Sequence, residues 1–209
     1  SGVFTRSGKG IYNLNPRLSP RLIMKEKILF HDRYIEDLFR ENTEEMYSYV
    51  RESECSLFNR KSVKEIVEEI YQKHKIENIS LDLKDSRILW VDERSFVLGI
   101  PLNEGEELLD YRPGVDCGAV CPVGRYEEGW LKKSFDSEKR PDRIKDEIKS
   151  WKQTIDRYVS NLDEAVVHHH KKLQKEIHDA LQTKKKRCEK SKGLIDQLGI
   201  MMEEQGGMG

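Results

Sequence analysis

The stretch PDRIKDEIKSWKQTIDRYVSNLDEAVVHHHKKLQKEIHDALQTKKKRCEKSK, residues 141–192, decides the fold. Pro141 stands where a helix would start, and no further Gly or Pro occurs before Gly193. Up to Leu162 the apolar residues recur in alternating steps of four and three, which is a heptad spacing. Beyond Leu162 the steps follow an eleven-residue repeat, which favours a straighter helix. The sequence therefore predicts one unbroken helix over 142–192, roughly 75 Å long.

This helix needs partners along its apolar stripe, because an exposed stripe of that size exceeds what a soluble monomer usually tolerates. Short N-terminal helices can cover only part of it, so we expect a second copy to cover the rest and the chain to form a homo-oligomer. His169 and Lys184 interrupt the stripe, which argues against a perfect coiled coil. The expected assembly stripe consists of Ile144, Ile148, Trp151, Ile155, Leu162, Val166, Leu173 and Ile177.

The composition agrees with an elongated molecule. Apolar residues make up 36% of the 209 residues and charged residues another 36%, too few apolar side chains for a large spherical core. The formal net charge is −1, no apolar run is long enough to span a bilayer, and no signal peptide opens the chain. We therefore expect a cytoplasmic protein with no membrane partner. The opening Ser1-Gly2, without an initiator methionine, indicates a cleaved expression tag and an engineered fragment.

The remainder of the chain predicts an α+β fold, in which N-terminal helices and a small antiparallel sheet precede the long helix. Helical spacing runs from Arg21 to about Lys75, with Asn42 as the cap of a second helix and Ser62 with Glu65 as the capping box of a third. Period-two patterns then indicate strands between Ile76 and Phe135. The expected units are an irregular arm (1–20), a small α+β domain (21–135), the coiled-coil-like helix (141–192) and a short helix or flexible tail (193–209).

No set of residues predicts a catalytic, cofactor or metal site, so we expect a chain that is not an enzyme. Cys117 and Cys121 lack a second ligand pair at zinc spacing, and all four cysteines are expected to be reduced thiols. The triplet 168–170 cannot form a metal cage on a helix, since adjacent side chains point about 100° apart. We interpret these histidines as polar helix surface, with His169 near the stripe.

Basic residues gather in two places, and they define an alternative function. Arg17 and Arg21 belong to a basic N-terminal region, while Lys184, Lys185, Lys186 and Arg187 form a run near the other end. Such clusters are available to contact nucleic-acid phosphates. The interspersed acids Glu176, Asp179 and Glu189 favour an ordinary solvated surface instead.

Residues 90–200 resemble a protein family. Ile100-Pro101-Leu102, then Gly105 and Leu108, then Leu109-Asp110-Tyr111-Arg112-Pro113 precede a long charged helix, in a pattern similar to the N-terminal accessory region of large bacterial defence or restriction-type proteins. In that family a downstream effector, often a nuclease of the PD-(D/E)xK class, performs the chemistry. The resemblance implies a non-catalytic regulatory and oligomerisation module that partners an effector domain, with Tyr111, Arg112 and Pro113 shaping a sheet–helix junction. A nucleic-acid-binding module is the main alternative, and an enzyme with a site around Cys117 is a third.

Overall fold

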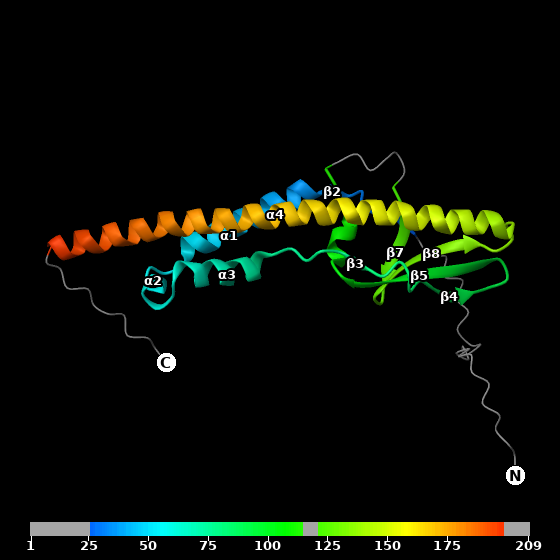
Figure 1. Ribbon diagram of the computed structural model, residues 1–209, viewed down its shortest axis with the longest axis horizontal. Helices are drawn as coiled ribbons and strands as arrows, with labels where there is room; N and C mark the ends of the chain where they lie inside the picture. The colour runs from blue at the N-terminus through cyan, green and yellow to red at the C-terminus, as the bar shows by residue number, and fades with distance from the viewer. Residues whose placement is uncertain (1–25, 115–120, 199–209) are drawn as a thin grey trace, which may run out of the picture.

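One helix forms the spine of the molecule (Figure 1). The computed structural model describes residues 26–114 and 121–198, and within it helix α4 runs from Pro141 to Leu198 without a break. The expected single long helix is therefore confirmed, but it continues past Gly193. One glycine costs a helix only about 1 kcal/mol, which is too little to end it. None of the helices in the described ranges is long and apolar enough to cross a membrane.

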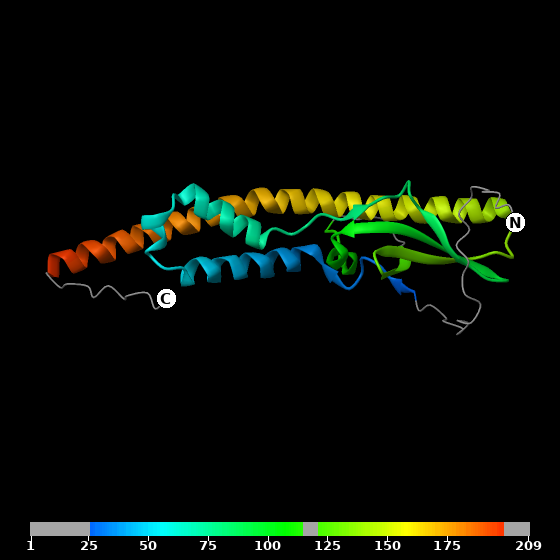
Figure 2. The same ribbon diagram turned by 90° about the horizontal axis from the view of Figure 1, so that it is seen from below.

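The first half of α4 lies against a curled antiparallel sheet, a half-barrel in shape (Figures 1 and 2). The long strand β5 is central: it pairs with β8 along one edge and with β4 and then β3 along the other. Strands β7 and β8 form a hairpin through Glu128 and Gly129, which both have positive φ, as tight hairpin turns require. The strands are β1 (Lys27–Ile28), β3 (Ser80–Leu81), β4 (Arg87–Val91), β5 (Ser95–Glu104), β7 (Val123–Glu127) and β8 (Trp130–Asp136).

The sheet and α4 enclose the larger of two apolar cores. Trp151, Ile155 and Tyr158 of α4 are buried there together with sheet residues such as Ile100 and Leu131. Polar contacts fix the position of the helix as well: the indole Nε1 of Trp151 donates to the Val123 carbonyl at 2.9 Å. Further along, the Asp163 carboxylate accepts from the Ile79 amide at 3.2 Å and from Asn78 Nδ2 at 3.1 Å.

The second half of α4 forms a three-helix bundle with α1 (Ile35–Glu52) and α3 (Val63–His74), which the short α2 (Leu57–Arg60) connects. Their shared core contains Met46, Val50, Ile66, Ile70, Leu173, Ile177 and Leu181. The expected capping box at the start of α3 is present, because the Ser62 hydroxyl accepts from the Glu65 amide and the Glu65 carboxylate accepts from the Ser62 amide.

The sequence interpretation was wrong about the first helices. Residues 27–28 and 33–34 are short strands, and α1 is a single helix that passes through Asn42 rather than starting there. Asparagine is a common helix cap, but the Asn42 side chain instead forms hydrogen bonds to α3 and α4. The wider burial of α1 against α4 outweighs the weak helix propensity of that one position.

Strand β2 (Arg33–Tyr34) pairs in parallel with β6 (Tyr111–Arg112) directly before α1 begins. Each strand contributes one arginine and one tyrosine to two cation–π contacts. The Arg33 guanidinium lies over the Tyr111 ring, and the Arg112 guanidinium lies over the Tyr34 ring. Strand β6 follows the 3-10 helix η1 (Glu106–Asp110). The Tyr-Arg motif therefore lies where the sheet half meets the helical half.

Candidate interaction site

The expected assembly stripe lies inside the chain. Six of its residues are buried by the chain's own sheet and helices, namely Trp151, Ile155, Leu162, Val166, Leu173 and Ile177, while Ile144 and Ile148 are half-buried. The N-terminal helices cover only the distal half of α4, as expected, but the sheet covers the proximal half. This placement corrects the expectation that a second copy covers these positions. Leu181, buried four residues after Ile177, extends the stripe beyond the predicted set.

The two polar residues in the stripe each contact α1. His169 Nε2 lies 3.1 Å from Asn42 Oδ1, and its ring stacks on Phe39 with centroids 4.2 Å apart. Lys184 Nζ donates to the carbonyl oxygens of Val50 (2.8 Å) and Arg51 (2.6 Å) at the end of α1. Those carbonyls have no partner within their own helix, so a cation there is favourable. The two positions at which polar residues interrupt the apolar stripe are therefore the positions at which α4 forms hydrogen bonds to α1.

Two histidines at this junction have lowered pKa values. Burial, together with the neighbouring His170, Lys172 and His168, lowers the pKa of His169 to about 4. Burial, with Lys73, also lowers the pKa of His74, which packs edge-on against Tyr49. His169 is 4% exposed, which confirms the expectation that it lies near the stripe, and His168 is exposed. A group of three or more metal-binding side chains is absent from the described residues.

Cys55 and Cys188 form a disulfide that joins the α1–α2 turn to the distal part of α4. This pair contradicts the expectation of four reduced thiols. The two residues are 133 positions apart, and only the packing of α1 along α4 brings them together. Cys121 is a free thiol, and its Sγ lies 3.3 Å from the Tyr158 hydroxyl. Cys117 lies outside the described residues.

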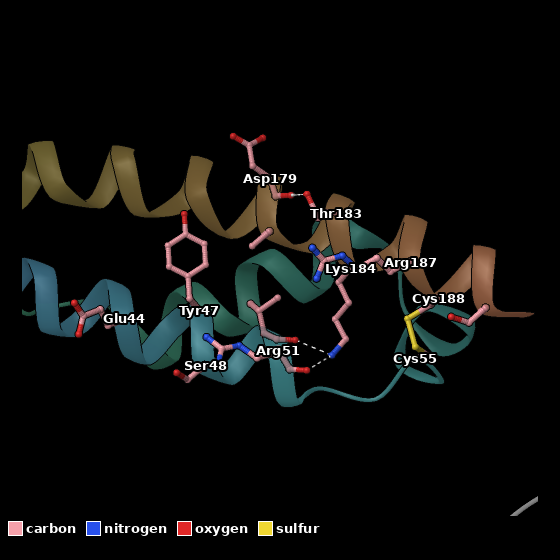
Figure 3. A pocket seen from close by; sticks show the side chains of 13 residues that line it. Glu44, Tyr47, Ser48, Arg51, Cys55, Asp179, Thr183, Lys184, Arg187 and Cys188 are labelled. Carbon is pink, nitrogen blue, oxygen red and sulfur yellow. Dashed lines mark hydrogen bonds between the residues drawn. A yellow bond between two sulfur atoms is a disulfide. The ribbon is translucent and has the colours of Figure 1, made fainter.

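A groove runs between α1 and α4 (Figure 3). It has a volume of about 900 Å³, and the Cys55–Cys188 disulfide lies at one of its ends. Val50, Ala180 and the half-exposed Tyr47 supply apolar surface. A smaller hollow of about 420 Å³ continues along the same helix pair and shares Glu44 and Tyr47 with the groove. The helix pair thus presents one continuous depression.

Five charged residues line the groove. Lys184 donates to carbonyl oxygens of α1, and the other four are Glu44 and Arg51 from α1 and Asp179 and Arg187 from α4. None of the four forms an ion pair with another residue in the described parts of the chain. In contrast, Lys172 at the neighbouring hollow pairs with Glu176 of its own helix. Burial, together with Glu176 and Asp179, raises the pKa of the Tyr47 hydroxyl, so the side chain stays protonated and neutral at physiological pH.

The basic residues that were expected to contact nucleic acid have different surroundings in the structure. Lys184 is bonded to α1, and Lys185 lies 4.0 Å from Glu189 in an ion pair. Arg187 lines the groove, and Lys186 is exposed. Arg17 and Arg21 lie outside the described residues. The four basic residues of this run therefore have different surroundings.

Sequence reasoning did not identify the groove, because its lining comes from two helices whose relative position depends on the whole bundle. The available signal was the amphipathic pattern of α1, in which Glu44, Tyr47, Ser48 and Arg51 share one face opposite the buried Met46 and Val50. Comparisons with known proteins add no further guide, since no protein-family model, no curated protein and no solved structure matches this chain.

Proposed function

We propose that the chain is a non-catalytic assembly module, which binds protein through the exposed side of its three-helix bundle. The observation that carries this proposal is the α1/α4 groove, where half-exposed Tyr47 lies among four charged residues without ion-pair partners in the described chain. The sheet half is different, because there α4 and the sheet bury their apolar side chains in a shared core. A sheet half with a buried core and a helical half with an open groove are consistent with a module that binds other chains through the groove.

The direct test is the mass of the purified chain in solution. Sedimentation velocity over a range from one to tens of micromolar is expected to show concentration-dependent self-association. A chain that stays monomeric throughout that range contradicts the proposal as it concerns self-assembly. Catalysis is tested separately: the purified protein is expected to carry no stoichiometric metal and to hydrolyse neither nucleotides nor DNA. One zinc per chain that is lost on replacing Cys117 and Cys121 would contradict that part.

We further propose that the module serves a bacterial defence or restriction-type protein and regulates its effector domain. This part rests on the resemblance of residues 90–200 alone. Tyr111 and Arg112, which carry the resemblance, pair with Arg33 and Tyr34 where the sheet half joins α1. The decisive observation is the coding sequence that follows in the parent gene, where an effector domain is expected. A parent protein without one contradicts this assignment and leaves the assembly proposal intact.

The cytoplasm is the compartment we propose, and the Cys55–Cys188 pair makes that proposal testable. Disulfides are rare in the reducing cytosol and common outside it. If the protein works in the cytosol, protein trapped with a thiol-blocking reagent directly from cells should carry both residues as thiols. A disulfide that is quantitatively present in such samples would indicate an oxidising compartment.

A further inference from the structure

We infer that the α1/α4 groove is a twofold interface between two copies of this chain, centred on Tyr47 and Ser48. The inference rests on the proposed assembly function and assigns its surface and symmetry. The first observation is the direction of the two helices. The Asn42–His169 contact lies near one end of the helix pair and the Cys55–Cys188 disulfide near the other, so α1 and α4 run in the same direction.

Both helices carry their free charges in the same order. On α1 the acid Glu44 precedes the base Arg51 by seven positions, and on α4 the acid Asp179 precedes the base Arg187 by eight. These separations correspond to about 10 and 12 Å along a helix. Glu44 lies at one end of the groove, the acidic end, while Lys184 and Arg187 lie toward the basic end beside the disulfide, and Asp179 and Arg51 lie between them (Figure 3).

Such a groove is complementary to itself when one copy is turned by 180°. In an antiparallel arrangement the acidic end of each copy faces the basic end of the other, whereas a parallel arrangement would oppose like charges. Twofold symmetry makes the contacts reciprocal: Glu44 of each copy faces the partner's Arg51, and Arg51 faces the partner's Glu44. One symmetric contact thus gives Glu44 and Arg51 of both copies a partner of opposite charge.

The midpoint between Glu44 and Arg51 falls at Tyr47 and Ser48, which places an aromatic side chain at the centre of the interface. Tyr47 is 41% exposed in the single chain, and a neutral tyrosine offers both apolar area and a hydroxyl. Aromatic residues at the centre of an interface, surrounded by polar groups, commonly dominate binding. Phe39 in the adjoining hollow extends the apolar surface along α1.

The test reverses the charges one at a time and then together. Glu44→Arg and Arg51→Glu each place like charges opposite one another twice in the dimer, so each is expected to weaken dimerisation at least about tenfold. The double variant Glu44→Arg/Arg51→Glu restores opposite charges and is expected to return the dissociation constant to within about threefold of the unmodified chain. Lys171→Glu, an exposed reversal on α4 outside the groove, is the matched control and is expected to leave dimerisation unchanged.

Sedimentation equilibrium at low and high salt measures each dissociation constant, and circular dichroism establishes that every variant remains helical. Three outcomes are informative. Weakening by both single variants with rescue by the double variant supports the interface. A dimer that none of the reversals weakens, or one that the double variant weakens further, overturns the interface but leaves the assembly function standing. A monomeric unmodified chain overturns both.

Discussion

The side-chain oxygen of Asn42 on α1 lies 3.1 Å from Nε2 of His169 on α4, inside the apolar seam of the bundle. Asn42 Nδ2 also donates to the His74 carbonyl at the end of α3, at 2.8 Å, so one amide joins all three helices. Because the amide nitrogen is used by His74, Asn42 Oδ1 accepts from His169, which must carry its proton on Nε2. The structure thus assigns a neutral Nε2–H tautomer to His169.

This junction predicts loss of stability in mild acid. The pKa of His169 falls to about 4 in the folded chain, against about 6.5 in the unfolded chain, so the unfolded state binds more protons between those values. Stability should therefore decrease as the pH falls from 6.5 to 4, by roughly 3 kcal/mol in total from this residue. His74 acts in the same direction, because burial lowers its pKa too. Asp163 acts oppositely at the acidic end, since burial raises its pKa.

Urea unfolding at a series of pH values measures the effect, and His169→Gln isolates it. Glutamine keeps an amide donor for Asn42 but does not titrate in this range. The variant should show a flatter dependence of unfolding free energy on pH than the unmodified chain. His178→Gln, at an exposed position of the same helix, is the control. Equal slopes for His169→Gln and the unmodified chain would show that His169 is not buried as described.

The disulfide predicts a redox-dependent stability. Cys55 and Cys188 are separated by 133 residues, and a covalent link across so long a segment restricts the unfolded chain. Replacing both by alanine should lower the unfolding free energy by roughly 2–5 kcal/mol under oxidising conditions. The same replacement should have little effect when reductant is present, since the disulfide of the unmodified chain is then reduced and no longer links the two segments. Cys121→Ala serves as the thiol control. A deficit that persists undiminished in reductant would point to lost packing.

Lys184 is expected to stabilise the C-terminal end of α1. Its Nζ donates to the carbonyls of Val50 and Arg51, and burial lowers its pKa. Lys184→Met keeps the aliphatic stem but removes the donors, and should destabilise the chain by about 1 kcal/mol. Lys186→Met, an exposed neighbour, should have no measurable effect. Thermal unfolding compares the two. Equal melting temperatures for both variants would assign Lys184 to the solvated surface.

The long helix was predictable because its evidence is local. A regular spacing without Gly or Pro identifies α4 and its buried face from Trp151 to Ile177 without reference to any other element. The element that covers each part of that face was not predictable. The sheet closes over Trp151 through a register set by β5 and β8, and such long-range pairing leaves no trace in the spacing of α4 itself.

Residues with two plausible local roles were the ones interpreted incorrectly. Asn42 followed by acidic residues has the composition of a helix cap, and only the positions of α3 and α4 reveal that its amide is a bridge. Cys55 and Cys188 lie far apart in a sequence with few signs of an oxidising environment, so nothing local links them. In the sequence the charged residues of the groove look like ordinary surface residues, because only the packing of α1 on α4 brings them together.

The contact between Trp151 and the sheet gives the last prediction. Trp151 is 3% exposed, packs edge-on against Phe135 with ring centroids 5.9 Å apart, and donates to the Val123 carbonyl. Trp151→Ala should remove roughly 3–5 kcal/mol of stability, because it leaves a cavity between α4 and the sheet. Trp151→Phe keeps most of the apolar volume but leaves the Val123 carbonyl without its donor, so its cost should be smaller, roughly 1–3 kcal/mol. Trp90, 46% exposed on β4, provides the matched control, and Trp90→Ala should change stability little. Urea unfolding followed by far-ultraviolet circular dichroism measures all three variants, and a Trp90→Ala loss equal to that of Trp151→Ala would contradict the placement of the sheet on α4.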